Sequence, residues 1–153
     1  MTTATIATTE ADQRAAHLAF TQALIDDFRA NGGTVAGGPL GGRQIVLLTT
    51  TGARTGLPRT CPLVYSMDGA DHIVVASKGG APVPPAWYLN LLADPVVTVE
   101  VAGEAFQARA TVIGGGPDRD RLYARHAEVE PGFLEYESRT DRVIPVVRLA
   151  RIS

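Results

Sequence analysis

Residues 52–90 read GARTGLPRTCPLVYSMDGADHIVVASKGGAPVPPAWYLN, and the turns and strands in this segment indicate the topology of the whole chain. A turn bounded by Gly52 and Gly56 leads into a strand over residues 59–66. Asp68-Gly69 is typical of a tight hairpin turn, and a further strand follows over residues 72–76. Pro82, Pro84 and Pro85 prevent regular structure before residue 86. Strands joined by such short turns predict an antiparallel sheet rather than a doubly wound parallel one.

The flanking segments complete the predicted architecture. Residues 12–30 form a predicted amphipathic helix, because Ala16, Phe20, Leu24 and Phe28 recur every four residues, with Leu18 and Ile25 beside them. We predict strands over residues 45–51, 96–101, 105–113 and 143–152. Helical pieces are predicted over residues 86–93, 118–127 and 131–138.

The sum of these elements is an α+β fold. We predict a mostly antiparallel, six-stranded closed or split β-barrel with an N-terminal helix and flanking short helices, because closure removes free sheet edges. Residues 1–11 are predicted to be a disordered tail and residues 12–153 a single domain. Within that domain the Gly-rich residues 31–42 form a predicted linker. The helix and linker together could act as a lid, or the helix could pack permanently on the barrel.

Composition excludes several classes of protein. The chain has 153 residues, of which 20% are charged and 45% hydrophobic, as in a globular domain. A net charge of −2 argues against a nucleic-acid partner. Cys61 is the single cysteine, which excludes an intrachain disulfide and favours a reducing, cytoplasmic location. We find no signal peptide, and no apolar run reaches the ~18–20 residues of a membrane span.

The charges are unevenly distributed. Arg29, Arg43, Arg54 and Arg59 lie between residues 28 and 67, where the chain has no acidic residue. Lys78, the only lysine, lies in a second stretch without acids, residues 72–93. The pattern favours a bounded anionic ligand, although strands simply poor in acids would also produce it.

The sequence lacks the motifs typical of enzymes whose side chains catalyse a reaction without an organic cofactor. His17, His72 and His126 are scattered and have no ligand spacing, so we predict no metal site. The sequence contains no GxSxG elbow, no GxxxxGK[ST] loop and no GxGxxG after a strand. We therefore expect a bound cofactor to supply the chemistry.

Arg54, Arg59 and Lys78 are the candidate anion ligands. Arg54 lies in the glycine-bounded turn, where backbone N–H groups can approach a ligand and a guanidinium can bind phosphate through two hydrogen bonds. Lys78 ends a strand and precedes Gly79-Gly80. An exposed hairpin with surface arginines, and ordinary solvation of a strand end, remain the alternatives.

The aromatic residues also allow two readings. Trp87, the only tryptophan, could stack on a planar ring or plug the end of the barrel. Phe133, Tyr136 and Arg139 have roughly helical spacing and could cover a pocket or form ordinary core.

Three segments resemble a known family. LLTTTGARTGLPRTCPL, VVASKGGAPVPPAWYLNLLADP and TDRVIPVVRL are similar to the deazaflavin (F420)-dependent nitroreductase family, and the resemblance covers most of residues 45–152. That family belongs to the FMN-binding split β-barrel group. The resemblance implies binding of coenzyme F420, whose phospholactyl-polyglutamate tail is strongly anionic.

The resemblance also implies roles for individual residues. The cofactor-binding positions would be Arg54, Thr55 and Arg59 at the phosphate and tail, Pro62 and Leu63 beside the cofactor, Ala76, Ser77 and Lys78 at the deazaflavin or ribityl chain, and Trp87, Tyr88, Asn90 and Phe133 in the same groove. Ser77 and Tyr136 are the candidates for a proton donor or a substrate-orienting group. Val64 and Glu130 stand where the best-known member has tyrosines in its substrate wall, so the motifs do not name the electron acceptor.

The resulting hypothesis is an F420-dependent oxidoreductase. It would transfer a hydride from reduced F420 to a small hydrophobic acceptor such as a quinone, enone or nitroaromatic compound. The alternatives are an FMN- or haem-binding oxidoreductase on the same barrel and a non-catalytic F420 carrier. A homodimer and peripheral contact with a membrane are compatible with the sequence.

Overall fold

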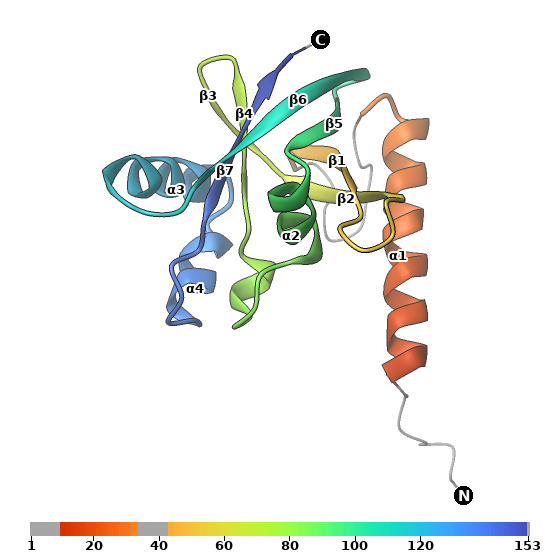
Figure 1. The fold of residues 1–153 in the computed structure, drawn as a ribbon, viewed down its shortest axis with the longest axis horizontal. Helices are drawn as coiled ribbons and strands as arrows, with labels where there is room; N and C mark the ends of the chain where they lie inside the picture. The colour runs from red at the N-terminus through yellow and green to blue at the C-terminus, as the bar shows by residue number, and fades with distance from the viewer. Residues whose placement is uncertain (1–9, 34–42, 153) are drawn as a thin grey trace, which may run out of the picture.

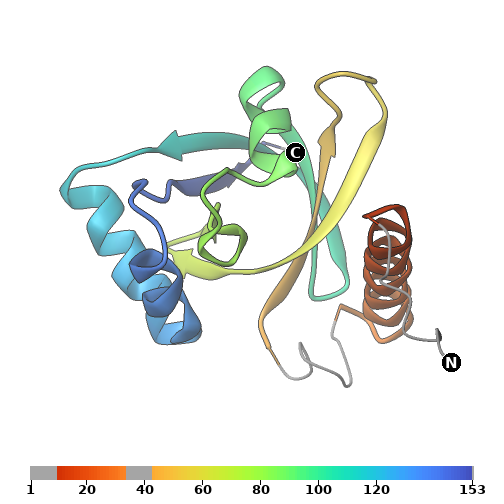
Figure 2. The same cartoon turned by 90° about the horizontal axis from the view of Figure 1, so that it is seen from below.

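Seven antiparallel strands form the centre of the computed structural model, which describes residues 10–33 and 43–152. In chain order the strands are β1 (Ile45–Thr51), β2 (Pro58–Val64), β3 (Ser66–Asp68), β4 (Asp71–Val75), β5 (Val96–Val101), β6 (Glu104–Ile113) and β7 (Val146–Arg151). They are arranged in the order β2-β1-β5-β6-β7-β4-β3, and Figures 1 and 2 show the sheet curling into a barrel.

A change of partner at Tyr65 closes the barrel. Val64 at the end of β2 pairs with Ile45 of β1, whereas Ser66 at the start of β3 pairs with Ile73 of β4. The two outermost strands of the sheet are therefore consecutive in the chain and separated by a single residue. The split β-barrel is confirmed, but the predicted strand over residues 59–66 is two strands, so the count of six is wrong.

Both faces of β1 are buried. Val46 and Leu48 belong to the cluster inside the barrel, whereas Ile45 and Leu47 pack with Leu24, Ile25 and Phe28 outside it. Because neighbouring residues of a strand point to opposite sides, a continuous apolar run is what such a strand requires.

Helices cover two sides of the barrel and one end. Helix α1 (Glu10–Ala30) lies beside β1 and β2, and α3 (Pro117–Val129) and α4 (Gly132–Ser138) lie on the opposite side (Figures 1 and 2). Helix α2 (Ala86–Ala93) contributes Trp87 and Leu91 to the interior cluster. A short 3-10 helix, η2 (Lys78–Gly80), precedes the Pro-rich loop.

Only the second half of α1 packs closely on the barrel. Leu24, Ile25 and Phe28 are buried, whereas Leu18 and Phe20 are 61% and 47% exposed. The predicted helix is confirmed, but its predicted apolar stripe is covered only near the C-terminal end. A bidentate contact between Arg29 and Glu100 of β5 fixes that end, with N–O distances of 3.0 and 2.8 Å.

The remaining elements agree with the sequence within a few residues. The predicted bounds of β1, β5 and α2 are those observed, and α1 begins two residues before the predicted start. Residues 1–9 of the predicted tail and residues 34–42 of the predicted linker lie outside the described residues. No helix among the described residues has the length and apolar character needed to cross a bilayer.

Candidate functional site

A cleft of about 1050 Å³ lies at one end of the barrel, between β2, the start of α2, α4 and the side of α1. It is lined by His17, Gly52, Ala53, Arg54, Thr55, Arg59, Cys61, Leu63, Val64, Val75, Ser77, Lys78, Pro85, Ala86, Trp87, Leu89, Asn90, Phe133 and Tyr136. The cleft therefore brings together the four segments that the sequence marked separately: the basic turn, the Ser-Lys-Gly-Gly step, the start of α2 and the late aromatic residues.

The alternation of β2 determines which of its side chains line the cleft. Arg59, Cys61 and Leu63 are lining residues, as expected for every second residue of a strand, and Val64 at the end of β2 lines the cleft as well. Pro62, between Cys61 and Leu63, is not a lining residue. Cys61 was not predicted as a site residue, although this period of two pointed to it.

The turn before β2 is tightly hydrogen-bonded. Gly52 N donates to the Leu57 carbonyl and Gly56 N to the Gly52 carbonyl, both at 2.8 Å, and Leu57 N donates to Thr55 Oγ1 at 3.2 Å. A Cβ on Gly52 would lie 2.7 Å from Thr55 Oγ1 and 3.1 Å from the Leu57 carbonyl oxygen, so a larger residue here would displace the Thr55 side chain. The turn is therefore a preformed support for Arg54.

Asn90 connects this turn to α2. Its Oδ1 accepts a hydrogen bond from Ala53 N at 3.0 Å, and its Nδ2 donates to Thr50 Oγ1 at 3.1 Å. Asn90 lines the cleft as predicted, but its amide stabilises the backbone of the turn.

A second tight turn presents Ser77 and Lys78. Lys78 has φ +48°, a left-handed conformation that is uncommon for a residue other than glycine. Gly80 has φ +83°, and a Cβ there would lie 2.6 Å from the Tyr136 carbonyl oxygen. The turn thus packs directly on α4, with Ser77 buried and Lys78 exposed. Ala76, predicted as a cofactor contact, is fully buried among the interior residues and does not line the cleft.

We call Arg54, Arg59 and Lys78 the cationic rim. All three are exposed cleft residues, and within residues 10–33 and 43–152 none has a carboxylate partner. The predicted positive region is smaller than its sequence suggested. Arg29 pairs with Glu100 and Arg43 with Glu130, acids that are distant in the chain.

Aromatic side chains form the inner wall of the cleft. Trp87 is 6% exposed and belongs to the interior cluster while also lining the cleft, so its indole packs inside the barrel and also faces the cleft. Phe133 and Tyr136 contact each other edge to face, with ring centroids 5.1 Å apart. Tyr88 packs against the interior cluster and is not a lining residue.

The thiol in the cleft is poorly suited to nucleophilic chemistry. Burial raises the pKa of Cys61 to about 11, so the neutral thiol dominates at neutral pH. Its Sγ lies 3.7 Å from the Pro62 carbonyl oxygen. Among the described residues there is also no group of three His, Cys, Asp or Glu side chains that could hold a metal ion.

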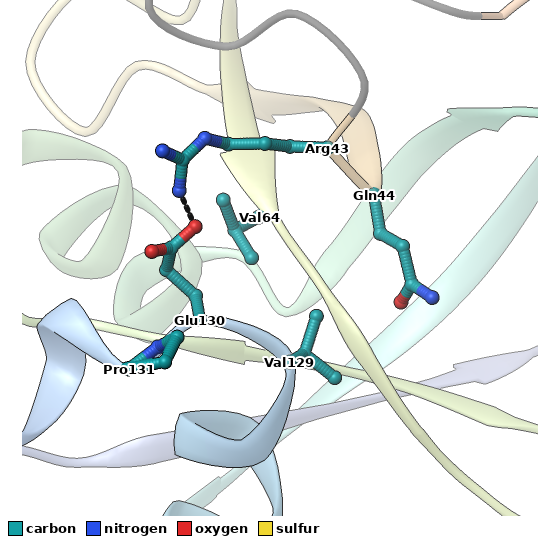
Figure 3. A pocket seen from close by; sticks show the side chains of 6 residues that line it. All are labelled: Arg43, Gln44, Val64, Val129, Glu130 and Pro131. Atoms are coloured by element: carbon teal, nitrogen blue, oxygen red, sulfur yellow. Dashed lines mark ion pairs between the residues drawn. The ribbon is translucent and has the colours of Figure 1, made fainter.

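A smaller hollow of about 420 Å³ lies beside the cleft, and Val64 lines both (Figure 3). Its other lining residues are Arg43, Gln44, Val129, Glu130 and Pro131. Figure 3 shows the Arg43–Glu130 ion pair spanning this hollow from the start of β1 to the α3–α4 connection. Glu130, a residue of the predicted substrate wall, is therefore engaged by an arginine that the sequence did not connect with it.

The geometry describes a site for a long, partly anionic and partly aromatic ligand. Cations lie on the rim, and Leu63, Trp87 and Phe133 supply apolar surface inside. Three of the predicted cofactor-binding residues do not line the cleft: Pro62, Ala76 and Tyr88.

The chain is similar to known proteins over most of its length. Residues 21–150 match the family model described as F420H(2)-dependent quinone reductase. F420H(2)-dependent quinone reductase Rv1261c of Mycobacterium tuberculosis (strain ATCC 25618 / H37Rv) is 40% identical over 126 residues, which are 81% of this chain and 85% of that protein.

Two solved structures are also similar. The structure of an F420-H2 dependent reductase, FDR-A, is 38% identical, with a TM-score of 0.64 over 70% of this chain and 94% of its own. A domain-swapped dimer is 33% identical, with a TM-score of 0.65 over 90% of this chain and 95% of its own.

Proposed function

Since the chain belongs to the F420H(2)-dependent quinone reductase family, we propose that its cleft binds the deazaflavin coenzyme F420 and passes reducing equivalents to a hydrophobic quinone-like acceptor. The chain is an F420H2-dependent reductase. The observation that supports the proposed site is the cationic rim above an apolar cleft, in the segments where the family motifs lie.

The donor set of the cleft fits F420. A phosphate and several carboxylates require cations and N–H donors, and Arg54, Arg59 and Lys78 provide cations at the cleft mouth. The absence of carboxylate partners for these three residues in the described part of the chain leaves their charges available to a ligand. In this proposal, Arg54, Thr55 and Arg59 bind the phosphate and tail, and Lys78 lies closer to the rings.

The inner cleft fits a flat ring system. Leu63, Trp87 and Phe133 offer apolar surface for a deazaflavin and an acceptor, and this surface excludes water from the reacting atoms. When bound, reduced F420 supplies a hydride. The protein contributes orientation, which converts an encounter of two molecules into a reaction within one complex.

Reduction of a quinone to its neutral hydroquinone requires one hydride and one proton. Ser77 and Tyr136 line the cleft and carry hydroxyl groups, so we assign them the role of delivering this proton or orienting the acceptor oxygen. Tyr136 Oη and Glu130 Oε1 both lie near Gly132, the first residue of α4, at 3.6 and 3.8 Å from the position that a Cβ there would occupy.

We also propose that the protein forms a homodimer. Leu18 and Phe20 of α1 are exposed apolar side chains, and the solved relative that covers 90% of this chain is a domain-swapped dimer. Burying such side chains against a second copy is favourable. The oligomeric state in solution, measured by light scattering, tests this part of the proposal.

The activity is tested by following the absorbance of reduced F420 during incubation with the protein and a panel of quinones, enones and nitroaromatic compounds. We expect oxidation that depends on both protein and quinone. Binding of F420 without oxidation by any acceptor would indicate a carrier rather than a reductase. A purified protein that carries FMN or haem, and on which F420 does not bind, would contradict the proposal.

A further inference from the structure

We propose that Arg142 is a positioning residue for the cofactor site, because its guanidinium fixes the loop of residues 76–83 in the conformation that presents Ser77 and Lys78 to the cleft. Arg142 does not line the cleft. It lies in the connection between α4 and β7, and it contacts backbone oxygens on both sides of η2. The inference rests on the proposed binding of F420.

The contacts of Arg142 bracket the turn. Its terminal NH2 nitrogen lies 3.0 Å from the Ala76 carbonyl oxygen and 2.9 Å from that of Ser77, which precede the turn. Its Nε donates to the Ala81 carbonyl at 2.9 Å, beyond the turn. A longer contact of 3.4 Å reaches the Val83 carbonyl. Since one NH2 group has two hydrogens, Val83 shares a donor with one of the nearer carbonyls.

The loop needs donors that it cannot supply itself. Pro82, Pro84 and Pro85 have no backbone N–H groups, and the turn itself contributes hydrogen bonds from Gly80 N to the Ser77 carbonyl and from Ala81 N to the Lys78 carbonyl. Lys78 also holds a left-handed φ of +48°. Partly buried carbonyls require partners. The guanidinium supplies donors to the Ala76 and Ala81 carbonyls and a second donor to the Ser77 carbonyl.

Arg142 is itself firmly placed. Its backbone N donates to Thr140 Oγ1 at 3.3 Å, and the Ile144 carbonyl accepts from buried Arg119 at 2.9 Å. Ala76 N donates to the Pro145 carbonyl at 3.1 Å, which joins the two connections where β4 and β7 meet. The planar, forked guanidinium can reach both sides of the turn at once, whereas a lysine ammonium is a single point of donation.

The affinity for F420 should therefore depend on the fraction of molecules in which residues 76–83 hold the conformation that places Ser77 and Lys78 at the cleft. If the loop samples others, the apparent dissociation constant for F420 rises in proportion to the lost fraction. Lys78 would remain in the chain, but its ammonium would no longer be held at the cleft.

The test compares Arg142→Ala with two controls, Arg125→Ala on the exposed surface of α3 and Ile25→Ala in the cluster between α1 and β1. The first control removes an arginine, and the second lowers stability at a side chain that does not line the cleft. Each protein is titrated with F420 by fluorescence well below its Tm. Hydrogen exchange of the amides of residues 77–81 is measured without cofactor.

We expect Arg142→Ala to raise the Kd for F420 by about tenfold or more and to accelerate exchange in residues 77–81. Both controls should keep wild-type values, although Ile25→Ala should have a lower Tm. Adding Lys78→Ala to Arg142→Ala should weaken binding less than Lys78→Ala does alone, because the two residues act together. If Arg142→Ala does not fold, Arg142→Lys takes its place, with the same direction of change.

Wild-type affinity together with wild-type exchange in the Arg142 variant would overturn the inference, as would an equal loss of affinity in Ile25→Ala. The exchange measurement needs no cofactor, so it separates this inference from the proposed function. A wild-type protein that does not bind F420 would remove the proposed function, whereas unchanged exchange in the variant would remove the role of Arg142.

Discussion

Asn90 accepts a hydrogen bond from the backbone N–H of Ala53, and this 3.0 Å contact joins α2 to the turn that carries Arg54. The same amide donates to Thr50 Oγ1 at 3.1 Å. The buried Asn90 side chain thus helps to fix the position of Arg54 relative to the aromatic residues of the cleft.

Replacing Asn90 by alanine should weaken both stability and cofactor binding. Removing a partner from buried polar groups costs about 1–3 kcal/mol, so we expect the free energy of unfolding to fall by that amount in a denaturant titration. The Kd for F420 should rise because the turn is less well fixed. A Kd for F420 in Asn90→Ala equal to that of the wild type would show that the Ala53 contact does not position the turn.

Lys78→Ala should weaken F420 binding by about tenfold to a hundredfold, the range for one hydrogen bond to a charged group. The dependence of Kd on salt should also become shallower, because one fewer positive charge is screened. Arg125→Ala, on the exposed face of α3, is the matched control and should leave both quantities unchanged. An unaltered Kd for Lys78→Ala would remove this residue from the binding site.

Cys61 should be slow to react and dispensable for turnover. Because burial raises the pKa of its thiol to about 11, the reactive thiolate is scarce at pH 7. We expect slow labelling by a thiol reagent compared with a free cysteine peptide, further slowed by bound F420. Cys61→Ala should retain F420H2-dependent activity. Rapid labelling at neutral pH, or loss of turnover with F420 still bound, would contradict the assignment of a passive wall residue.

His126 should make the protein less stable in mild acid. Burial lowers its pKa from 6.5 to about 4, and its Nδ1 lies 2.7 Å from Ser66 Oγ beside the ring of Phe133. Between these two pKa values His126 binds a proton in the unfolded chain but stays neutral in the folded protein. The contribution is therefore complete above pH 6.5 and is lost as the pH falls toward 4, by on the order of 3 kcal/mol.

The measurement is denaturant unfolding at several pH values between 4 and 7.5 for the wild type and for His126→Asn. The variant should show a shallower loss of stability in acid, whatever its stability at pH 7. Burial also lowers the pKa of His72, which contributes in the same direction in both proteins. Hydrogen bonds from Arg121 and then Arg148 lower the pKa of Asp68 to about 2, so that group acts below this range. Parallel curves for the two proteins would exclude His126 as the cause.

Much of the fold could be predicted because patterns within short segments of the sequence determine most of its strands and turns. The apolar run of β1 and the turn residues Asp68 and Gly69 gave correct elements, since burial and turn geometry are local requirements. The extra strand could not be found in this way. Tyr65 lies within an unbroken strand-like sequence, and only the pairing of its neighbours with opposite edges of the sheet divides β2 from β3.

The same distinction applies to the site. Glycines and cations marked the two turns, and the period of β2 was sufficient to suggest Cys61. Contacts between distant segments left no such signal. The pairing of Arg43 with Glu130 and the contacts of Arg142 with the loop after β4 join residues 87 and about 60 positions apart, and they follow from the closed barrel alone.

The proposed cofactor site is tested most directly by titrating F420 against the wild type and against a variant with Arg54, Arg59 and Lys78 all replaced by alanine. We predict saturable binding by the wild type at micromolar protein. The triple variant should keep its Tm, because all three side chains are exposed, and should lose most of that affinity. A folded triple variant that binds F420 as tightly as the wild type would contradict the claim that these three cations bind the anionic coenzyme.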